Sequence, residues 1–458
     1  MGNGSSFKLM RMNLNCVLRR KVAGLMFGAL ALAAPWTAFA QNNFIAGADM
    51  SLLAYYESYG VVYKDNGRVG DAIQILKNHG INCIRLRLFT SSAAQAQADP
   101  YDYINNLAYT VPLAVRVKNA GLQFCLDFHY SDTWADAGHQ ATPAAWLTNN
   151  FSQMVQQMYT YNSNCIAAFA AAGAMPDYVQ IGNEITQGML YTNSLGQDIG
   201  QVSGNYNTSW NQLGQLMKAA VQGIQDAANS AGEPVPKIIV HIDTGGNWST
   251  TEWFFDNLNY QQVPYDIIGL SYYPFWHGPL SSLSNCLTNA AQRYGKLVVV
   301  AETDFPWANS TNIDGIPATT NGQVQYVVAL TQVVKSVPNN LGAGIFWWGT
   351  EYQVPNANNA GFGYRSFFDN NANLLPAADA WGQTAAPIDL NASLTLPTDL
   401  RLQWPLSGAG MTLMTTTSLA PSAAWQPVTN PVQNTGTLFD VTLPVDSTQS
   451  RFYRLQSN

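Results

Sequence analysis

The sequence is poor in charged residues. Only 11% of its 458 residues are Asp, Glu, Lys or Arg, and Lys and Arg together number 21. Proteins that bind nucleic acids cluster Lys and Arg on one face, whereas this chain has a formal net charge of −7 and no basic stripe. Hydrophobic residues make up 47% of the chain, enough to bury a large core. The composition therefore indicates a globular protein without a nucleic-acid partner.

The only long apolar run lies near the N-terminus, where basic residues precede VAGLMFGALALAA. Pro35 ends this run before it reaches the ~20 apolar residues that a membrane-spanning helix needs. The following PWTAFA supplies a small-residue cleavage site before Gln41. Residues 1–40 are therefore predicted to be a secretory signal peptide. Export to the medium, the periplasm or the cell surface follows, and no membrane span is expected elsewhere.

Cysteine is scarce as well. Of the 5 cysteines, Cys16 lies in the predicted signal peptide, and Cys83, Cys125, Cys165 and Cys286 remain. This density is far below that of a disulfide-stabilised scaffold, and the absence of a C-x-x-C pair argues against a zinc site. Because Cys83 and Cys125 lie inside strand-like runs, we expect both to be buried free thiols.

Short β-rich runs alternate with segments of helical periodicity over residues 41–387. Buried strands joined by helices pair in parallel, and eight of them predict a (β/α)8 barrel. A doubly wound open sheet is the alternative, but no G-x-G-x-x-G follows the first run. Helices are expected over 69–80, 102–121, 209–228 and 321–337. The expected strands are 44–49, 82–89, 122–129, 178–182, 237–243, 266–272, 296–302 and 342–348.

The composition changes near Ala386 and Pro387, after which Thr, Ser and Pro are frequent and no helix-length pattern occurs. Residues 388–458 are predicted to form a small all-β, sandwich-like module. Its expected strands are LRLQWP, MTLMTTT, LFDVTLP and RFYRLQ. Its role is left open among sugar binding, wall attachment and spacing.

Nearly every expected barrel strand ends on a polar or aromatic residue. In a (β/α)8 barrel the functional residues lie at these carboxyl ends. A full ring of such residues is difficult to explain by packing alone. The ring consists of Asp49, Arg87, His129, Glu184, Asp243, Tyr273, Glu302 and Trp348.

Two carboxylates that face each other across a barrel mouth suit glycoside hydrolysis. Glu184 ends the fourth expected strand after Asn183, and Glu302 ends the seventh. A separation of about 5–5.5 Å gives retention of configuration, and about 6.5–9.5 Å gives inversion. We interpret Glu184 as the acid/base and Glu302 as the nucleophile, kept ionised by Arg87 and the Tyr273 hydroxyl. Of the two arginines on the second strand, Arg87 is preferred because it lies nearer the strand end.

The motifs GADMS, DFHYSDTWAD, QIGNEITQGMLY, GLSYYPFW and VVVAETDFPW, in this order, resemble the endo-β-1,4-galactanases of glycoside hydrolase family 53. The likeness runs from about Asn43 to Trp381. It implies a retaining clan A barrel that cleaves β-1,4-galactan in pectin side chains or type I arabinogalactan. The eighth strand departs from the family pattern, because IFWWGTEYQ stands where many members have Trp before Glu-Pro.

Carried over by position, the resemblance gives roles to further residues. It implies that Glu184 is the acid/base, Glu302 the nucleophile, Asn183 the partner of a sugar 2-hydroxyl, and Arg87 and Tyr273 the residues that hold the nucleophile. Subsite-lining residues would be Asp49, His129, Asp132, Trp134, His241, Asp243 and Trp348. The rings of Trp134, Trp276, Trp307 and Trp348 suit stacking on pyranose faces. One of Trp347 and Trp348 should instead pack outward under helices.

The resemblance implies a polysaccharide substrate, and we expect a monomer that needs no cofactor. Some bacterial relatives hold a structural calcium near the eighth strand. The loop TEYQVPNANNAG (350–361) offers oxygen ligands but no acidic cluster, so no metal is predicted.

Three other functions were weighed against this one. A clan relative acting on mannan, glucan or xylan would use the same two glutamates, and a polysaccharide panel would separate it. A non-catalytic carbohydrate-binding barrel would be expected to lack one glutamate, and both are present. A serine hydrolase would need G-x-S-x-G, and GLSYY lacks the second glycine.

Overall fold

The computed structural model describes residues 44–202, 206–353 and 364–385, and most of the C-terminal part. The C-terminal ranges are 390–395, 399–405, 408, 411–420, 423–435, 438–445 and 449–457. The predicted signal peptide lies outside the described residues. The chain divides into a compact unit over Phe44–Ala386 and a second one that includes Pro387–Asn458.

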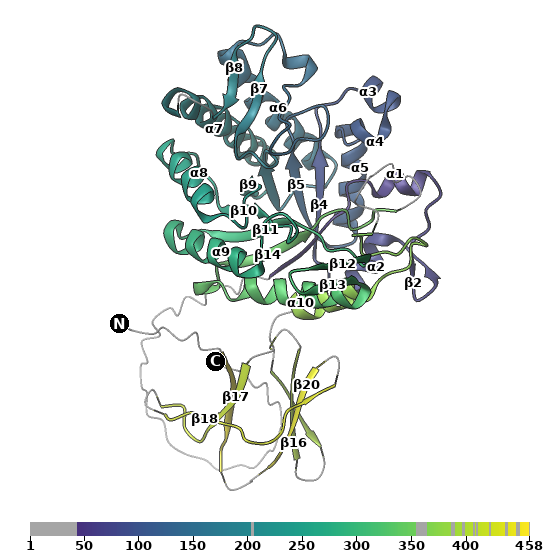
Figure 1. Ribbon diagram of the computed structural model, residues 1–458, viewed down its shortest axis with the longest axis vertical. Helices are drawn as coiled ribbons and strands as arrows, with labels where there is room; N and C mark the ends of the chain where they lie inside the picture. The colour runs from purple at the N-terminus through teal and green to yellow at the C-terminus, as the bar shows by residue number, and fades with distance from the viewer. Residues whose placement is uncertain are drawn as a thin grey trace, which may run out of the picture. The chain divides into compact units, whose positions relative to one another are not determined.

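The first unit is a closed parallel barrel surrounded by helices (Figure 1). Its strands neighbour one another in sequence order, and β1 closes the ring by pairing with both β4 and β14. The eight strands match the eight expected runs to within a residue or two, and the predicted (β/α)8 fold is confirmed. They are β1 (Ile45–Asp49), β4 (Cys83–Leu88), β5 (Gln123–Phe128), β6 (Tyr178–Ile181), β9 (Lys237–Ile242), β10 (Ile267–Ser271), β11 (Leu297–Thr303) and β14 (Gly342–Trp347).

Helices follow the strands, and asparagine caps begin several of them. Asn150 begins α6 with a capping box, in which its side chain accepts from Gln153 N. The helix expected over 102–121 is divided, because Asn106 caps a new helix by accepting from Tyr109 N. The helices are α1 (Leu53–Ser58), α2 (Ala72–Asn78), α3 (Ala93–Ala98), α4 (Pro100–Tyr103), α5 (Leu107–Asn119), α6 (Phe151–Ala171), α7 (Tyr206–Ala231), α8 (Trp248–Tyr260), α9 (Leu280–Tyr294), α10 (Thr320–Lys335) and α11 (Pro376–Ala385).

In the described part of the barrel unit, three two-stranded hairpins and two 3-10 turns lie outside the barrel sheet. The hairpins pair β2 (Lys64–Asp65) with β3 (Arg68–Val69), β7 (Gly188–Thr192) with β8 (Asp198–Gln201), and β12 (Ala308–Ile313) with β13 (Ile316–Thr319). The 3-10 turns are η1 (Ala144–Trp146) and η2 (Pro338–Asn340).

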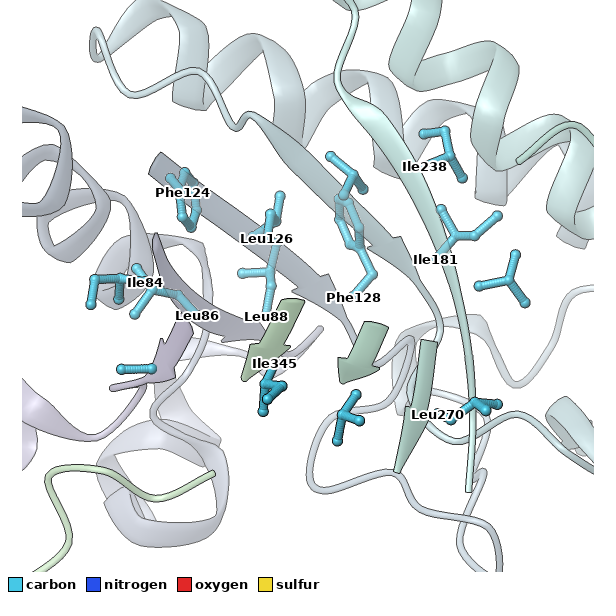
Figure 2. Close-up of a cluster of buried hydrophobic side chains, with 14 of the residues drawn as sticks. Ile84, Leu86, Leu88, Phe124, Leu126, Phe128, Ile181, Ile238, Leu270 and Ile345 are labelled. Carbon is cyan, nitrogen blue, oxygen red and sulfur yellow. The ribbon is translucent and has the colours of Figure 1, made fainter. Parts of the chain in front are cut away.

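Alternate residues of each strand face the helices or the barrel interior, as the two-residue period of a strand requires. Figure 2 shows part of the outer layer, in which side chains of β4 and β5 lie beside those of neighbouring strands. The residues between these, such as Cys83, Arg85 and Arg87 on β4, face inward. The inner layer is apolar at its base, where Ile239, Ile267 and Val299 pack together. The labelled outer residues are Ile84, Leu86, Leu88, Phe124, Leu126, Phe128, Ile181, Ile238, Leu270 and Ile345.

A register shift in β11 decides where the second glutamate points. Leu270 of β10 pairs with Val300, but the next residue, Ser271, pairs with Glu302. Ala301 is therefore an extra residue in β11, which is the arrangement of a β-bulge. Because of it, Glu302 faces the barrel interior at the level of Ser271.

The second unit contains two small antiparallel sheets with the four expected strands in them. One sheet has the order β15-β16-β20-β19 and the other β18-β17-β21. Leu402, Trp404, Leu413, Val441 and Leu443 form its apolar core. The strands are β15 (Asn391–Thr395), β16 (Asp399–Pro405), β17 (Met411–Thr416), β18 (Gln426–Pro427), β19 (Gln433–Asn434), β20 (Leu438–Pro444) and β21 (Phe452–Ser457).

The four cysteines of the barrel are buried free thiols, as expected for Cys83 and Cys125. Burial raises the pKa of both of these thiols. No helix in the described part of the chain has the length and apolar character needed to cross a membrane.

Candidate active site

Glu184 lies on a sharp turn directly after β6. Gly182 has φ 93° and Glu184 has φ 50°, both in the left-handed region that side chains disfavour. A Cβ at Gly182 would lie 2.6 Å from Cγ2 of Ile185, so only glycine fits there. Ile185 N then donates to His241 O at 3.0 Å, which ties the turn to β9. The strained backbone aims Glu184 into the barrel mouth.

Glu302 is held by two donors on opposite oxygens. Arg85 Nη2 lies 2.8 Å from Oε1, and the Tyr273 hydroxyl donates to Oε2 at 3.1 Å. The side chain is 8% exposed, so Glu302 is nearly but not fully buried. The predicted hydrogen bond between Tyr273 and Glu302 is present.

Arg85 is the buried centre of the site. Its guanidinium lies 3.0 Å from Asp49, 2.8 Å from Asp127 and 2.8 Å from Glu302. It also donates to the Asn183 side-chain oxygen at 2.9 Å. A buried charge is tolerated only when it is paired, and here one cation serves three carboxylates.

The expected contact of Arg87 with Glu302 is wrong, because Arg85 makes it. Asp49, the last residue of β1, is in register with Arg85, so Arg87 extends beyond β1 toward the rim. There Arg87 lies 3.3 Å from Asp49, and its guanidinium stacks 4.3 Å from the ring centre of Trp134. The choice of the arginine nearer the strand end overlooked the stagger between neighbouring barrel strands.

Glu184 belongs to a separate hydrogen-bond chain. Its Oε1 lies 2.5 Å from Ser271 Oγ, which in turn lies 2.8 Å from His241 Nε2. The other ring nitrogen of His241 is 3.0 Å from the Asn183 side-chain oxygen. Asn183 therefore connects the Glu184 chain with the arginine that holds Glu302.

The two glutamates differ in their electrostatic surroundings. Burial and the charge of Glu302 raise the pKa of Glu184 to about 8. Burial also raises the pKa of Glu302, but the Arg85 guanidinium opposes this shift. Since Glu184 has no such cation, it keeps its proton to higher pH than Glu302. The pair thus offers one acid and one carboxylate.

The histidines and Asp49 lie within the same network. His129 accepts from Ala135 N at Nδ1 and places Nε2 3.0 Å from Asp127. Burial and the nearby Arg85 charge lower the pKa of His241 well below its usual value, so this imidazole is neutral. Asp49, His129 and His241 are almost fully buried and contact other residues of the site, so they support it from beneath.

The tryptophans predicted to stack on sugar have different neighbours in the structure. Trp134 and Trp348 lie 6.3 Å apart between ring centres, beside Arg87. Trp276, which is 63% exposed, packs edge-on against Phe275 beyond β10. Trp307 packs against Tyr364 at 5.3 Å. Of the Trp347 and Trp348 pair, Trp347 packs outward, against Trp381 of α11.

Asp132 and Asp243 hold neighbouring segments of the chain together by hydrogen bonds. Asp132 accepts from Thr90 after β4, from Gln95 of α3 and from the backbone of Ala144 at the start of η1, so it joins three segments of the chain. Asp243 accepts from the hydroxyl of Thr186, two residues after Glu184.

Several polar residues of the site were missed or underused by the sequence reasoning. All but Glu351 are polar side chains within or directly after an apolar strand, and this alternation was the available signal. Glu351, fully buried, accepts from Leu52 N at 2.7 Å, and burial beside Asp49 raises its pKa to about 8. The missed residues are Asp127, Gln180, Ser271, Asp304 and Glu351.

No cluster of three or more His, Cys, Asp or Glu side chains suited to a metal ion occurs among the described residues. Most of the loop 350–361, considered above for calcium, lies outside them.

Comparison with known proteins now fixes the family. The sequence profile of glycosyl hydrolase family 53 matches residues 45–381, the whole barrel. The chain belongs to this family. It is therefore a glycoside hydrolase, and the family resemblance seen in the motifs is confirmed.

Relatives and solved structures agree with this assignment. The arabinogalactan endo-β-1,4-galactanase of Humicola insolens is 36% identical over 68% of this chain and 90% of its own length. A solved fungal β-1,4-galactanase is 33% identical with a TM-score of 0.64, covering 73% of this chain and 98% of its own. The family 53 catalytic domain of Ignisphaera aggregans is 30% identical with a TM-score of 0.66, covering 75% and 97%.

The contacts of the two arginines predict different effects of the same substitution. Arg85→Lys removes the planar fork that reaches Glu302, Asp49 and Asp127, and we expect kcat/KM to fall roughly 10- to 100-fold. Arg87→Lys, two residues along the same strand, should cause a smaller loss that appears mainly in KM, because Arg87 contacts Trp134 instead of Glu302. Steady-state kinetics on both variants checks this, and a larger loss of kcat in Arg87→Lys would contradict it.

Proposed function

We propose that this protein is a retaining endo-glycosidase that hydrolyses β-1,4-galactosidic bonds by double displacement. The observation that carries the proposal is the unequal environment of two carboxyls at the same barrel mouth. Glu302 has Arg85 at 2.8 Å, whereas Glu184 has only neutral partners in its hydrogen-bond chain. A carboxylate stabilised by a cation suits a nucleophile, and a carboxyl with a raised pKa suits an acid.

In the first step Glu184 donates its proton to the glycosidic oxygen while Glu302 attacks the anomeric carbon. The bond from that carbon to the leaving sugar breaks, and a covalent glycosyl-enzyme forms. In the second step the ionised Glu184 takes a proton from water, whose oxygen attacks the same carbon and releases Glu302. Asn183, held by Arg85, is placed to donate to the sugar 2-hydroxyl, an interaction that strengthens in the transition state.

The galactan specificity is supported by the family and by the names of its members. Relatives of about one-third identity that cover the barrel are named arabinogalactan endo-β-1,4-galactanases. We therefore propose β-1,4-galactan, from pectin side chains or type I arabinogalactan, as the substrate. The residues invoked all come from one chain and the chemistry needs only carboxyls, so we propose a monomer without a required cofactor.

We expect the mature chain to release reducing sugar from linear β-1,4-galactan, with little release from mannan, xylan or β-glucan. A parallel assay in EDTA should give the same rate, and light scattering of the assayed sample should give the mass of one chain. Cleavage of another polymer in preference to galactan would preserve the two-glutamate chemistry but reject the substrate.

Substitution of each glutamate separates the two roles. Glu302→Ala should abolish turnover with the fold intact, since no nucleophile remains. Glu184→Ala should be slow on galactan and partly rescued by azide, because the small anion attacks the glycosyl-enzyme without a base. Retention predicts a β-azido sugar, identified by NMR.

Circular dichroism of both variants is the control for folding. An α-azido product would reject the retaining mechanism, and full activity of Glu302→Ala would reject the nucleophile.

The N-terminal sequence supports export of the enzyme. We propose that cleavage follows Ala40, because a basic segment, an apolar segment and an Ala-Phe-Ala site occur in this order. Expression of the full chain in a secreting bacterial host should yield an exported protein whose N-terminal residue is Gln41. Retention of the uncleaved chain in the cytoplasm would overturn this expectation.

A further inference from the structure

The chain of hydrogen bonds behind Glu184 determines where its protons lie. Asn183 Nδ2 donates to Ala135 O at 2.8 Å, which orients the amide so that its oxygen faces His241. Arg85 and Gln180 also donate to this oxygen. Because an amide oxygen can only accept, the Nδ1 atom of His241 must carry a hydrogen.

The neutral state of His241 determines the direction of its hydrogen bond with Ser271. Burial and the Arg85 charge hold the pKa of His241 well below its usual value, so only one ring nitrogen is protonated. With the hydrogen on Nδ1, the Nε2 atom is an acceptor. Ser271 Oγ, at 2.8 Å from Nε2, must therefore donate its single hydrogen to His241.

These assignments determine the donor in the hydrogen bond between Ser271 and Glu184. Ser271 Oγ lies 2.5 Å from Glu184 Oε1, and its own hydrogen already points to His241. With the Ser271 hydrogen directed at His241, the hydrogen between the two oxygens comes from the Glu184 carboxyl, and Ser271 donates to Glu184 Oε1 only once that carboxyl is ionised. We propose that His241, acting through Ser271, is a positioning residue that keeps Glu184 in its protonated, acid form. This inference rests on the proposed role of Glu184 as acid/base.

The same chain can follow the proton through the reaction. When Glu184 gives its proton to the leaving oxygen, the Ser271 hydroxyl rotates and donates to the new carboxylate. His241 Nε2 then lacks its donor, and this unsatisfied acceptor is a cost borne only by the ionised state. When water returns a proton to Glu184, the Ser271 hydroxyl returns to His241. The imidazole stays neutral throughout. After both steps, Glu184, Ser271 and His241 together hold the same number of protons as at the start.

Other charged and titratable groups also act on Glu184, and the test must leave them unchanged. Glu302 on β11, Asp243 after β9 and Asp136 in the loop after β5 all raise its pKa. Tyr273, after β10, interacts with the same two glutamates. None of these four residues forms a hydrogen bond with His241. A substitution of His241 therefore leaves their side chains in place and tests the hydrogen-bond chain from Asn183 to Glu184.

Two substitutions of His241 test its hydrogen bonds with Asn183 and Ser271 separately. His241→Asn keeps a donor near the Nδ1 position, toward Asn183, but removes the acceptor for Ser271. His241→Gln keeps an acceptor near the Nε2 position. In His241→Asn the Ser271 hydroxyl has lost its acceptor on residue 241, so it can donate to ionised Glu184 without leaving an acceptor unsatisfied. The alkaline limb of the pH profile of kcat/KM should therefore move about one pKa unit toward lower pH. In His241→Gln the limb should stay close to that of the wild type.

A double-mutant cycle and a matched control complete the design. In the Ser271→Ala background, His241→Asn should no longer move the limb, because its effect passes through the hydroxyl. Ser91→Ala, which removes a buried hydroxyl that donates to Tyr103 O at 2.6 Å, should leave the limb unchanged. An unmoved limb in His241→Asn, or an equal shift in the Ser271→Ala background, would overturn the inference.

A spectroscopic measurement on the wild type tests the inference even where a variant does not fold. In ¹⁵N-labelled protein, His241 should be the neutral tautomer with Nδ1 protonated and Nε2 free, whereas a hydrogen on Nε2 would overturn the chain. Failure of the proposed function is distinguishable, since the wild type would then not cleave galactan or azide would not rescue Glu184→Ala. With both of those intact, an unmoved limb rejects only the role of His241.

Discussion

The site depends on the burial of one guanidinium in the barrel. Arg85 is fully buried, and an unpaired charge at that depth would be very costly. Asp49, Asp127 and Glu302 surround it, so β1 and β5 must pair with β4 in the observed register, and β11, which does not neighbour β4, must direct Glu302 into the barrel interior. The same contacts that make this charge tolerable position Glu302, the proposed nucleophile. Stability of the barrel centre and geometry of the reaction are therefore one constraint.

Glu184 and Glu302, the proposed acid and the proposed nucleophile, are distinguished by what surrounds them, since their side chains are identical. Glu302 receives the cation and a tyrosine hydroxyl, whereas Glu184 receives a serine and, through it, a neutral histidine. Asn183 belongs to both sets, because its oxygen accepts from Arg85 and from His241. The two carboxyls are thus connected through five short contacts, which run from Glu302 by way of Arg85, Asn183, His241 and Ser271 to Glu184.

Two local departures from regular backbone aim these groups. The extra residue Ala301 rotates Glu302 into the interior, and the left-handed turn at Gly182 does the same for Glu184. Each departure raises the conformational free energy of the backbone, and the packing of the surrounding strands offsets that cost. Regular strands alone would have directed the two carboxyls differently.

The sequence by itself determined the fold, the two glutamates and the family, because apolar periodicity and ordered motifs are local properties of the chain. It also indicated a ring of polar strand ends, of which Asp49 and Glu302 do meet at Arg85. It did not determine that Arg85, and not Arg87, reaches Glu302, nor that Ser271 and His241 stand behind Glu184. Those pairings depend on the stagger between strands and on the bulge in β11. Both arise only when the barrel closes, since side chains distant in sequence come level with one another only in the closed sheet.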